Sequence, residues 1–249
     1  MAGHSKWANI QHRKAAVDKK RAKRWTRILR EVTVSARLGG GDPDANPRLR
    51  SAMDDAKSDN VPNDTIDRAI KKGTGELEGA SYDEITYEGY GPGGVAIIVE
   101  TMTDNKNRTV AELRHLFSRF GGSLGETNSV AWMFDRRGLF ELEPGAMDEE
   151  EAMELALEIG VDDLDTEGDA IELYTSFEDY AGVREELERR EIPMATKKLA
   201  MVPQSNVEVG GEEASQALAL LDALEDYDDS QNVWANLTVD EESLAGEAG

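Results

Sequence analysis

The order of secondary-structure elements between Gly138 and Val202 constrains the fold of this chain more than any other feature of its sequence. Apolar runs and helical spacing predict, in order, a strand (139–142), a helix (148–159), a strand near Val161, a strand (170–174), a helix (177–190) and a strand (198–202). The order strand, helix, strand, strand, helix, strand is that of the ferredoxin-like α/β sandwich. We therefore predict a domain of this type over residues 136–204.

The segments on either side of this domain are each incomplete. Residues 80–135 predict a hairpin (82–90 and 95–99), a helix with a Thr109–Glu112 capping box and a strand (130–134). Residues 205–240 add only a helix (212–224) and an alternating strand (233–239). Neither piece can build a closed sheet with its own helices, so we expect both to join in one discontinuous α/β middle domain.

The first 75 residues predict helices alone. Trp25, Leu29 and Val32 recur at helical spacing in a helix over 22–38, which Gly39–Gly41 ends. Two shorter helices follow, one starting at Pro47 and one capped by Asn63 or Asp64 and ended by Gly73. The expected fold class is α+β, with an N-terminal helical bundle, a discontinuous α/β middle domain and an inserted βαββαβ domain.

The start of the chain does not fit the helical bundle. Asp18 and Arg21 fall on the core side when the apolar stripe is extended backwards, so residues 1–21 are expected to form a mobile arm.

Charge is segregated along the chain. Residues 1–75 hold 17 Lys or Arg against 9 Asp or Glu, a net +8, whereas the whole chain carries −23. A basic end on an acidic body indicates contact with a polyanion at the basic end, because neutralised phosphates supply most non-specific affinity for nucleic acids. Adaptation to high salt is an alternative reason for the acidity.

The predicted nucleic-acid contacts lie in the arm and on the polar side of the first helix. That side is basic without interspersed acids, whereas an ordinary solvated helix face has mixed charges. Trp7 and His4 lie among cations, which suits stacking on bases. The full set is His4, Lys6, Trp7, Arg13, Lys14, Lys20, Lys23, Arg27 and Arg30.

Two loops are further candidates for recognition. Tyr87 and Tyr90 flank a glycine-rich turn, which is either an ordinary hairpin turn or an exposed recognition tip. Lys106 and Arg108 lie in the polar segment Thr103–Thr109 before a helix, which is either a helix cap or an anion site.

Nothing in the sequence indicates catalysis. Cysteine is absent, which excludes disulfides and thiolate chemistry, and the histidines lack metal-ligand spacing. Asp42–Asn46 imitates the start of a calcium loop, but Pro47 and Met53 replace its required glycine and glutamate. We expect a cytoplasmic, non-enzymatic protein with no metal, cofactor, membrane contact or small-molecule substrate; a hydrolase built on the acidic clusters is the disfavoured alternative.

Five separated blocks of this sequence resemble the YebC/PmpR family, which includes a mitochondrial translational activator. They are Met1–Ile10, Gly39–Pro43 with Asn46–Leu49, Ala69–Gly75, Tyr87–Gly94 and Thr103–Thr109. The resemblance covers nearly the whole chain. It implies a helical N-terminal domain and two α/β domains, the middle one interrupted by the last.

The resemblance also implies a role in gene expression. Members are described as DNA-binding transcriptional regulators, and related ones as ribosome-associated factors that bind ribosomal RNA and relieve stalling at proline runs. We expect the first role and keep the second as the alternative. An acidic scaffold that docks a basic protein partner is a further alternative, of a different class.

Overall fold

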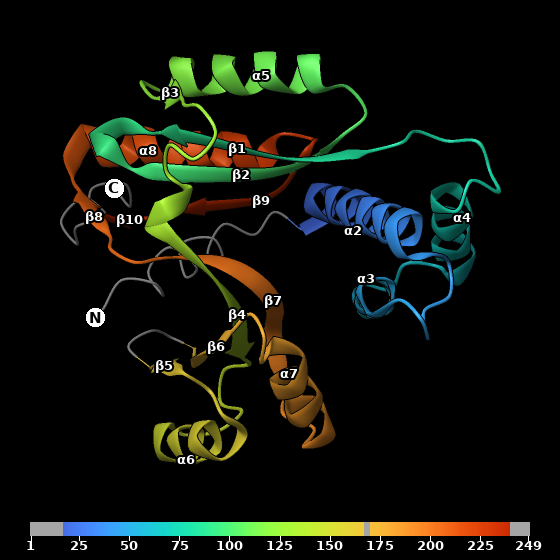
Figure 1. The fold of residues 1–249 in the computed structure, drawn as a ribbon. Coiled ribbons are helices and arrows are strands. Elements are labelled where there is room, and N and C mark those ends of the chain that lie inside the picture. Colours follow the sequence, from blue (N-terminus) through green and yellow to red (C-terminus); the bar gives the residue numbers. More distant parts are fainter. Residues whose placement is uncertain (1–16, 167–169, 240–249) are drawn as a thin grey trace.

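A computed structural model describes residues 17–166 and 170–239, with side chains from Ala22 onward. Three parts are visible in Figure 1: a helical N-terminal domain, a middle domain in which two helices cover a sheet, and a third domain below it. The α+β class with three domains is confirmed.

The N-terminal domain consists of the described helices α2 (Val17–Gly39), α3 (Pro47–Ser58) and α4 (Asn63–Gly73). Its core is aliphatic and includes Val32, Leu49 and Ile66. Trp25 packs against this core, and its indole N–H donates to the Asp59 carbonyl at 3.1 Å. Helix α2 begins at Val17, so the prediction of an arm over residues 1–21 was wrong for residues 17–21, and residues 1–16 lie outside the described part of the chain. The prediction of a side-chain cap on α4 was wrong, because Pro62 occupies its N-cap position.

Glycine and asparagine residues allow the three helices to pack closely. A Cβ at Gly73 would lie 2.3 Å from the Thr33 carbonyl oxygen, so α4 could not approach α2 with any other residue there. Gly40 takes a positive φ of 87° after α2. Buried Asn46 caps α3 and also donates to the Ser35 and Gly40 carbonyls. These bonds hold the end of α2 against the start of α3.

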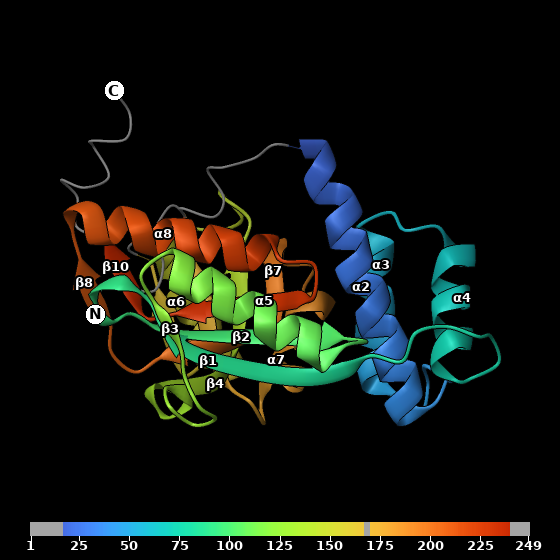
Figure 2. The ribbon, with the colours of Figure 1, turned by 90° about the horizontal axis from the view of Figure 1, so that it is seen from above.

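The middle domain has a four-stranded sheet in the order β3-β1-β2-β9. Its elements are β1 (Asp83–Tyr90), β2 (Ala96–Thr103), α5 (Lys106–Arg119), β3 (Ser123–Leu124), α8 (Gly211–Asp226) and β9 (Ser230–Ala235). Because β9 pairs with β2, the expected discontinuous domain is confirmed. Helices α5 and α8 both cover one face of the sheet (Figure 2), and leucine and valine side chains fill the space between.

Three expectations for this region were wrong. Helix α5 starts at Lys106 with Asn105 as its cap, so Thr109 lies inside the helix rather than at a capping box. Residues 131–133 form a 3-10 turn instead of a strand. The predicted strand over 233–239 divides, because β10 (Leu237–Val239) leaves the sheet and pairs in parallel with β8 (Val207–Val209). The alternation of apolar and polar residues over 233–239 does not show that the last three residues pair with a different strand from the first three.

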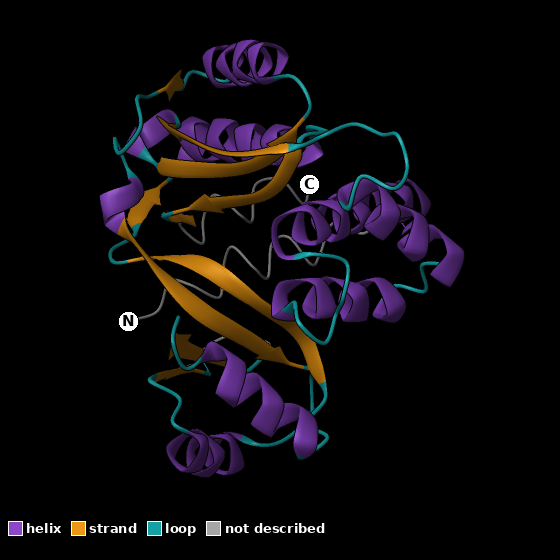
Figure 3. Cartoon of the chain, turned by 45° about the vertical axis from the view of Figure 1, so that its right-hand side comes forward, coloured by secondary structure: helices purple, strands orange, loops and turns teal. Residues whose placement is uncertain are grey.

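The third domain has the ferredoxin-like strand order β5-β6-β4-β7. Its elements are β4 (Phe134–Leu142), α6 (Glu149–Ile159), β5 (Asp163–Asp165), β6 (Glu172–Ser176), α7 (Tyr180–Arg189) and β7 (Met194–Pro203). The capping box of α6 joins Asp148 and Glu151. The long strands β4 and β7 run from the middle domain into this sheet (Figure 3), which connects the two α/β domains through paired backbone.

Candidate nucleic-acid interface

The basic side of α2 faces residues 225–229, which include the last two residues of α8 and form the acidic connection between α8 and β9. The Lys23 ammonium donates to the carbonyl oxygen and the carboxylate of Asp226, the latter at 3.2 Å. Arg27 donates to the Glu225 carbonyl. Burial lowers the pKa of Arg27, against the opposing effect of the Glu225 and Asp226 charges. Two of the predicted phosphate contacts are therefore engaged by the chain's own acidic segment.

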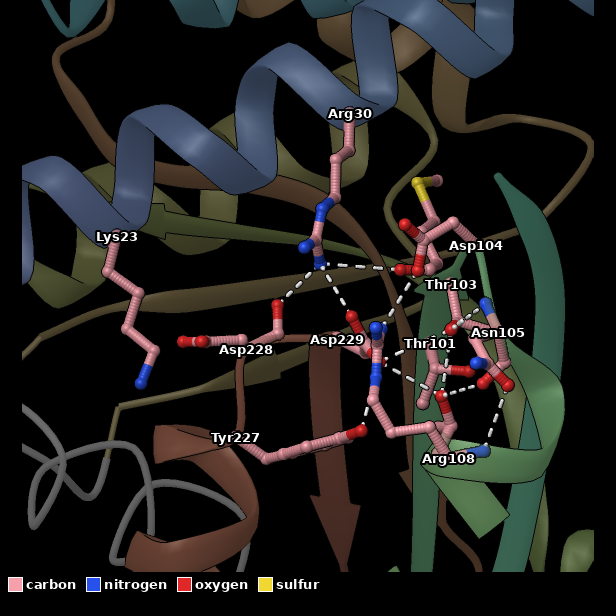
Figure 4. Close-up of polar contacts among 12 residues, drawn as sticks. Lys23, Arg30, Thr101, Thr103, Asp104, Asn105, Arg108, Tyr227, Asp228 and Asp229 are labelled. Carbon is pink, nitrogen blue, oxygen red and sulfur yellow. Dashed lines mark hydrogen bonds and ion pairs between the residues drawn. The ribbon is translucent and has the colours of Figure 1, made fainter. Parts of the chain in front are cut away.

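Arg30 enters the same contact more deeply (Figure 4). Its Nη1 donates to the Asp228 carbonyl at 2.5 Å and to the Met102 carbonyl at 3.3 Å. The same atom lies 3.4 Å from Asp229 Oδ1. The Arg30 side chain is 14% exposed and that of Asp229 only 3%, so this ion pair is shielded from water and salt.

Asp229 is the point where α2, α5 and β9 meet. Its Oδ2 accepts hydrogen bonds from Arg108 at 2.8 Å, Thr109 at 2.9 Å and Tyr227 at 2.9 Å. Burial raises the pKa of this carboxyl, but the hydrogen bonds outweigh it and hold the pKa below its ordinary value. The carboxylate therefore stays ionised at neutral pH.

This arrangement explains the polar segment before α5. Arg108 and Thr109 converge on an anion, as the anion-site interpretation requires, but the anion is Asp229 of the same chain. Asn105 caps the helix, so the cap interpretation also applies. Lys106 remains 60% exposed and lies 3.5 Å from the Asp83 carboxylate.

The two tyrosines of the hairpin are not an exposed tip. Both lie in β1 and are half-buried. Tyr87 packs against the middle-domain core, and the Tyr90 hydroxyl donates to the Ser129 carbonyl at 3.1 Å. The turn itself is a 3-10 segment (Pro92–Gly94) that carries no aromatic ring.

The remaining predicted contacts cannot be placed by the structure. His4, Lys6, Trp7, Arg13 and Lys14 lie outside the described residues. Lys20 belongs to α2, but its side chain is also outside the description.

The C-terminal half of α4 carries cations that the sequence analysis did not single out. Arg68, Lys71 and Lys72 lie on this helix, and among the described residues none of them forms an ion pair with a carboxylate. The sequence signal for them is the run of two lysines in the Ala69–Gly75 block, at the end of a predicted helix.

Further polar contacts join the N-terminal domain to the other two. Arg48 of α3 pairs with Glu31 of α2 and with Glu84 of β1, each at 2.6 Å, and these bonds raise its pKa. Arg184 of α7 donates to the Ser51 hydroxyl at 2.5 Å. The N-terminal domain is therefore held against the other domains by polar and charged groups.

Within the described residues, the structure supports neither a metal site nor a membrane-spanning helix. Over residues 17–166 and 170–239, no three His, Asp or Glu side chains lie close enough to hold a metal ion. None of the described helices has both the length and the apolar character needed to cross a bilayer.

These features define a class of three-domain α+β proteins, in which a basic helical domain precedes a middle domain interrupted by a ferredoxin-like insertion. The sequence matches the TACO1/YebC protein N-terminal domain over residues 5–76 and the TACO1/YebC second and third domain over residues 82–237. The chain belongs to the TACO1/YebC family.

Relatives of similar length support this assignment. A probable transcriptional regulatory protein of Natranaerobius thermophilus is 53% identical over 97% of this chain and 98% of its own length. One from Chlorobaculum parvum is 52% identical over 98% of both chains. The crystal structure of a conserved hypothetical protein from Aquifex aeolicus superposes with a TM-score of 0.88, at 44% identity over 96% of this chain and 98% of that one.

Proposed function

We propose that this protein is a cytoplasmic, non-enzymatic regulator of gene expression that binds nucleic acid through its N-terminal domain. The charge segregation carries this proposal: residues 1–75 are net +8 in a chain of −23. The acidic remainder repels a polyanion and so restricts contact to the basic end. The names of the relatives, probable transcriptional regulatory proteins, support regulation by binding to DNA.

The phosphate contacts of this proposal come from two groups. The first comprises the cations of residues 1–20, and the second comprises Arg68, Lys71 and Lys72 on α4, which have no carboxylate partner among the described residues. Lys23, Arg27 and Arg30 can join them only where the connection between α8 and β9 moves away, because it holds all three.

Structured ribosomal RNA is the second candidate partner, and one observation favours it. A helix that reads DNA sequence inserts its polar face into the major groove. The polar face of α2 is turned toward the body of the protein, and α3 and α4 are short. RNA recognition depends more on unpaired bases and on shape, which suits the aromatic groups Trp7 and His4 among cations.

An acidic scaffold for a basic protein partner is the third candidate. Dense acidic residues on α6 and α8 would provide its docking surface. This function would not require residues 1–16.

One pair of measurements separates these candidates. The full chain and a chain lacking residues 1–16, a deletion that leaves α2 whole, are titrated against a duplex DNA and a structured ribosomal RNA fragment at several salt concentrations. Binding that weakens with salt and with the deletion is expected. Crosslinking in cells followed by sequencing then identifies the nucleic acid. If the full chain binds neither probe, the proposal is contradicted, and the acidic scaffold becomes the favoured candidate function.

A further inference from the structure

A cleft lies between α2, α4 and the segment that leads into β1. Its volume is about 340 Å³. Small-ligand pockets measure roughly 300–1,000 Å³, so the cleft suits one small molecule or one nucleotide rather than a length of duplex. Gly73 permits the close approach of α2 and α4, the two helices that line the cleft.

The electrostatic character of this cleft is opposite to that of the chain. Arg30, Arg68 and Lys72 line it, and no Asp or Glu among the described residues does, although the sequence holds 51 acids. Arg68 and Lys72 come from successive turns of α4 and thus from one face of that helix. Because neither pairs with a carboxylate among the described residues, both are available to an anionic ligand.

An aromatic ring and hydroxyl groups also line the cleft. Tyr82 is half-buried, with the Arg30 guanidinium 5.2 Å from its ring centroid. Thr26, Thr33 and Thr65 also line the space. The hydroxyls of Thr26 and Thr33 donate to carbonyls of their own helix, so their oxygens remain as acceptors. An aromatic ring beside hydroxyl oxygens suits a planar ligand with polar edges.

We propose that this cleft binds one nucleotide, with its phosphate on Arg68 and Lys72 and its base stacked on Tyr82. The inference rests on the proposed nucleic-acid binding and names the unit that this cleft would hold, an unpaired nucleotide of a strand. Arg30 links the cleft to the Asp229 cluster, because the same guanidinium contacts both Tyr82 and Asp229.

The test uses the full chain and a fluorescein-labelled single-stranded RNA oligonucleotide, with adenosine monophosphate as the free-nucleotide probe. Removing a stacked base contact weakens binding about fivefold to 150-fold, so Tyr82→Leu is expected to lose that much affinity with an unchanged salt slope. Tyr82→Phe retains the ring and is expected to bind like the parent. Arg68→Gln with Lys72→Gln is expected to reduce the slope of log affinity against log salt by about 1.4.

Arg50→Gln with Lys57→Gln is the matched control for two charges, since both residues are exposed on α3 and neither lines the cleft. The cleft proposal is overturned if Tyr82→Leu and Tyr82→Phe bind with equal affinity. It is also overturned if Arg68→Gln with Lys72→Gln has no larger effect than the control. In either case, strand binding by the parent still upholds the proposed function. Binding of adenosine monophosphate that depends on Tyr82, without binding of the strand, keeps the nucleotide site but overturns its assignment to an unpaired nucleotide of a strand. Absence of binding to both probes overturns the cleft proposal, whereas the titrations with duplex DNA and structured ribosomal RNA decide the proposed function separately.

Discussion

Asp229 shows how one side chain can connect parts of the chain that are distant in sequence. Its side chain is 3% exposed and accepts hydrogen bonds from α5 and from Tyr227 while it pairs with Arg30 of α2. A buried carboxylate is tolerated only with such partners. The polar segment before α5 therefore serves mainly to hold this group, which its own sequence does not indicate.

We predict that Asp229→Asn weakens the attachment of the N-terminal domain by about 2 kcal/mol at neutral pH, the usual contribution of hydrogen bonds to a charged group. Since the folded-state pKa of Asp229 is lowered, its contribution is fully present above the unfolded value of about 3.9 and is lost as the pH falls through the lowered value. Urea unfolding measured at several pH values should show a difference between parent and variant that is constant above about pH 5 and shrinks in acid.

Asp228→Asn is the matched control, because Asp228 bonds to Arg30 through its backbone carbonyl, which the substitution retains. An equal loss of stability in both variants would contradict the role given to the Asp229 carboxylate.

Gly73 gives a second prediction at this scale. Gly73→Ala places a Cβ 2.3 Å from the Thr33 carbonyl, so α2 and α4 must separate, at a cost of about 1–3 kcal/mol. Hydrogen exchange of the α2 and α4 amides should become faster. Gly182→Ala in α7 meets no atom within 4 Å and is expected to stabilise its helix slightly. If the hydrogen-exchange rates of α2 and α4 are unchanged in the Gly73 variant, the two helices accommodate the added methyl group without loss of stability.

At the scale of elements, the connection between α8 and β9 competes with any polyanion for the basic side of α2. The Lys23–Asp226 pair is the part of this contact most open to solvent, because the Asp226 side chain is 84% exposed. Exposed pairs contribute about 0–1 kcal/mol, so this part of the contact is easily released.

We therefore predict that Asp226→Asn raises the affinity for a single-stranded RNA oligonucleotide by up to about fivefold, which corresponds to about 1 kcal/mol. Glu150→Gln, on the acidic start of α6 in the third domain, removes the same charge far along the chain and controls for the change in net charge. Equal effects of the two substitutions would mean that only net charge matters. Fluorescence anisotropy at fixed salt measures both.

At the scale of the whole molecule, the N-terminal domain is held by charged and polar contacts of unequal burial. The Lys23–Asp226 and Arg48–Glu84 pairs are partly exposed, whereas Arg30–Asp229 is shielded. Salt weakens exposed pairs far more than buried ones.

We predict that the parent keeps its radius of gyration between about 0.05 M and about 1 M NaCl, whereas Asp229→Asn expands as salt rises, because only the exposed pairs remain. Small-angle X-ray scattering measures the radius directly, and Asp228→Asn should behave as the parent does. An expansion of the parent equal to that of the Asp229 variant would show that the shielded pair does not hold the domains together.

Most of the architecture follows from local patterns in the chain. Helical spacing around Trp25 and Leu113, glycine stops such as Gly39–Gly41, and the alternation of strands and helices after Gly138 predict the element order and the ferredoxin-like domain. The discontinuous domain follows from the same patterns, because two incomplete pieces must share one sheet. Boundaries such as the start of α5 were missed, since Asn105 and Thr109 both suit a helix cap.

The sequence alone determined the family, the order of elements and the placement of positive charge at one end, because periodicity, turn residues and charge are local properties. Only the tertiary structure decided what that charge meets. The basic side of α2 faces Glu225, Asp226 and Asp228, and the cations of α4 border a cleft that no carboxylate of the described residues lines. The contacts of α2 join residues about 200 positions apart, and Lys23 and Asp226 are separated by 203 positions. No local pattern records such a distance.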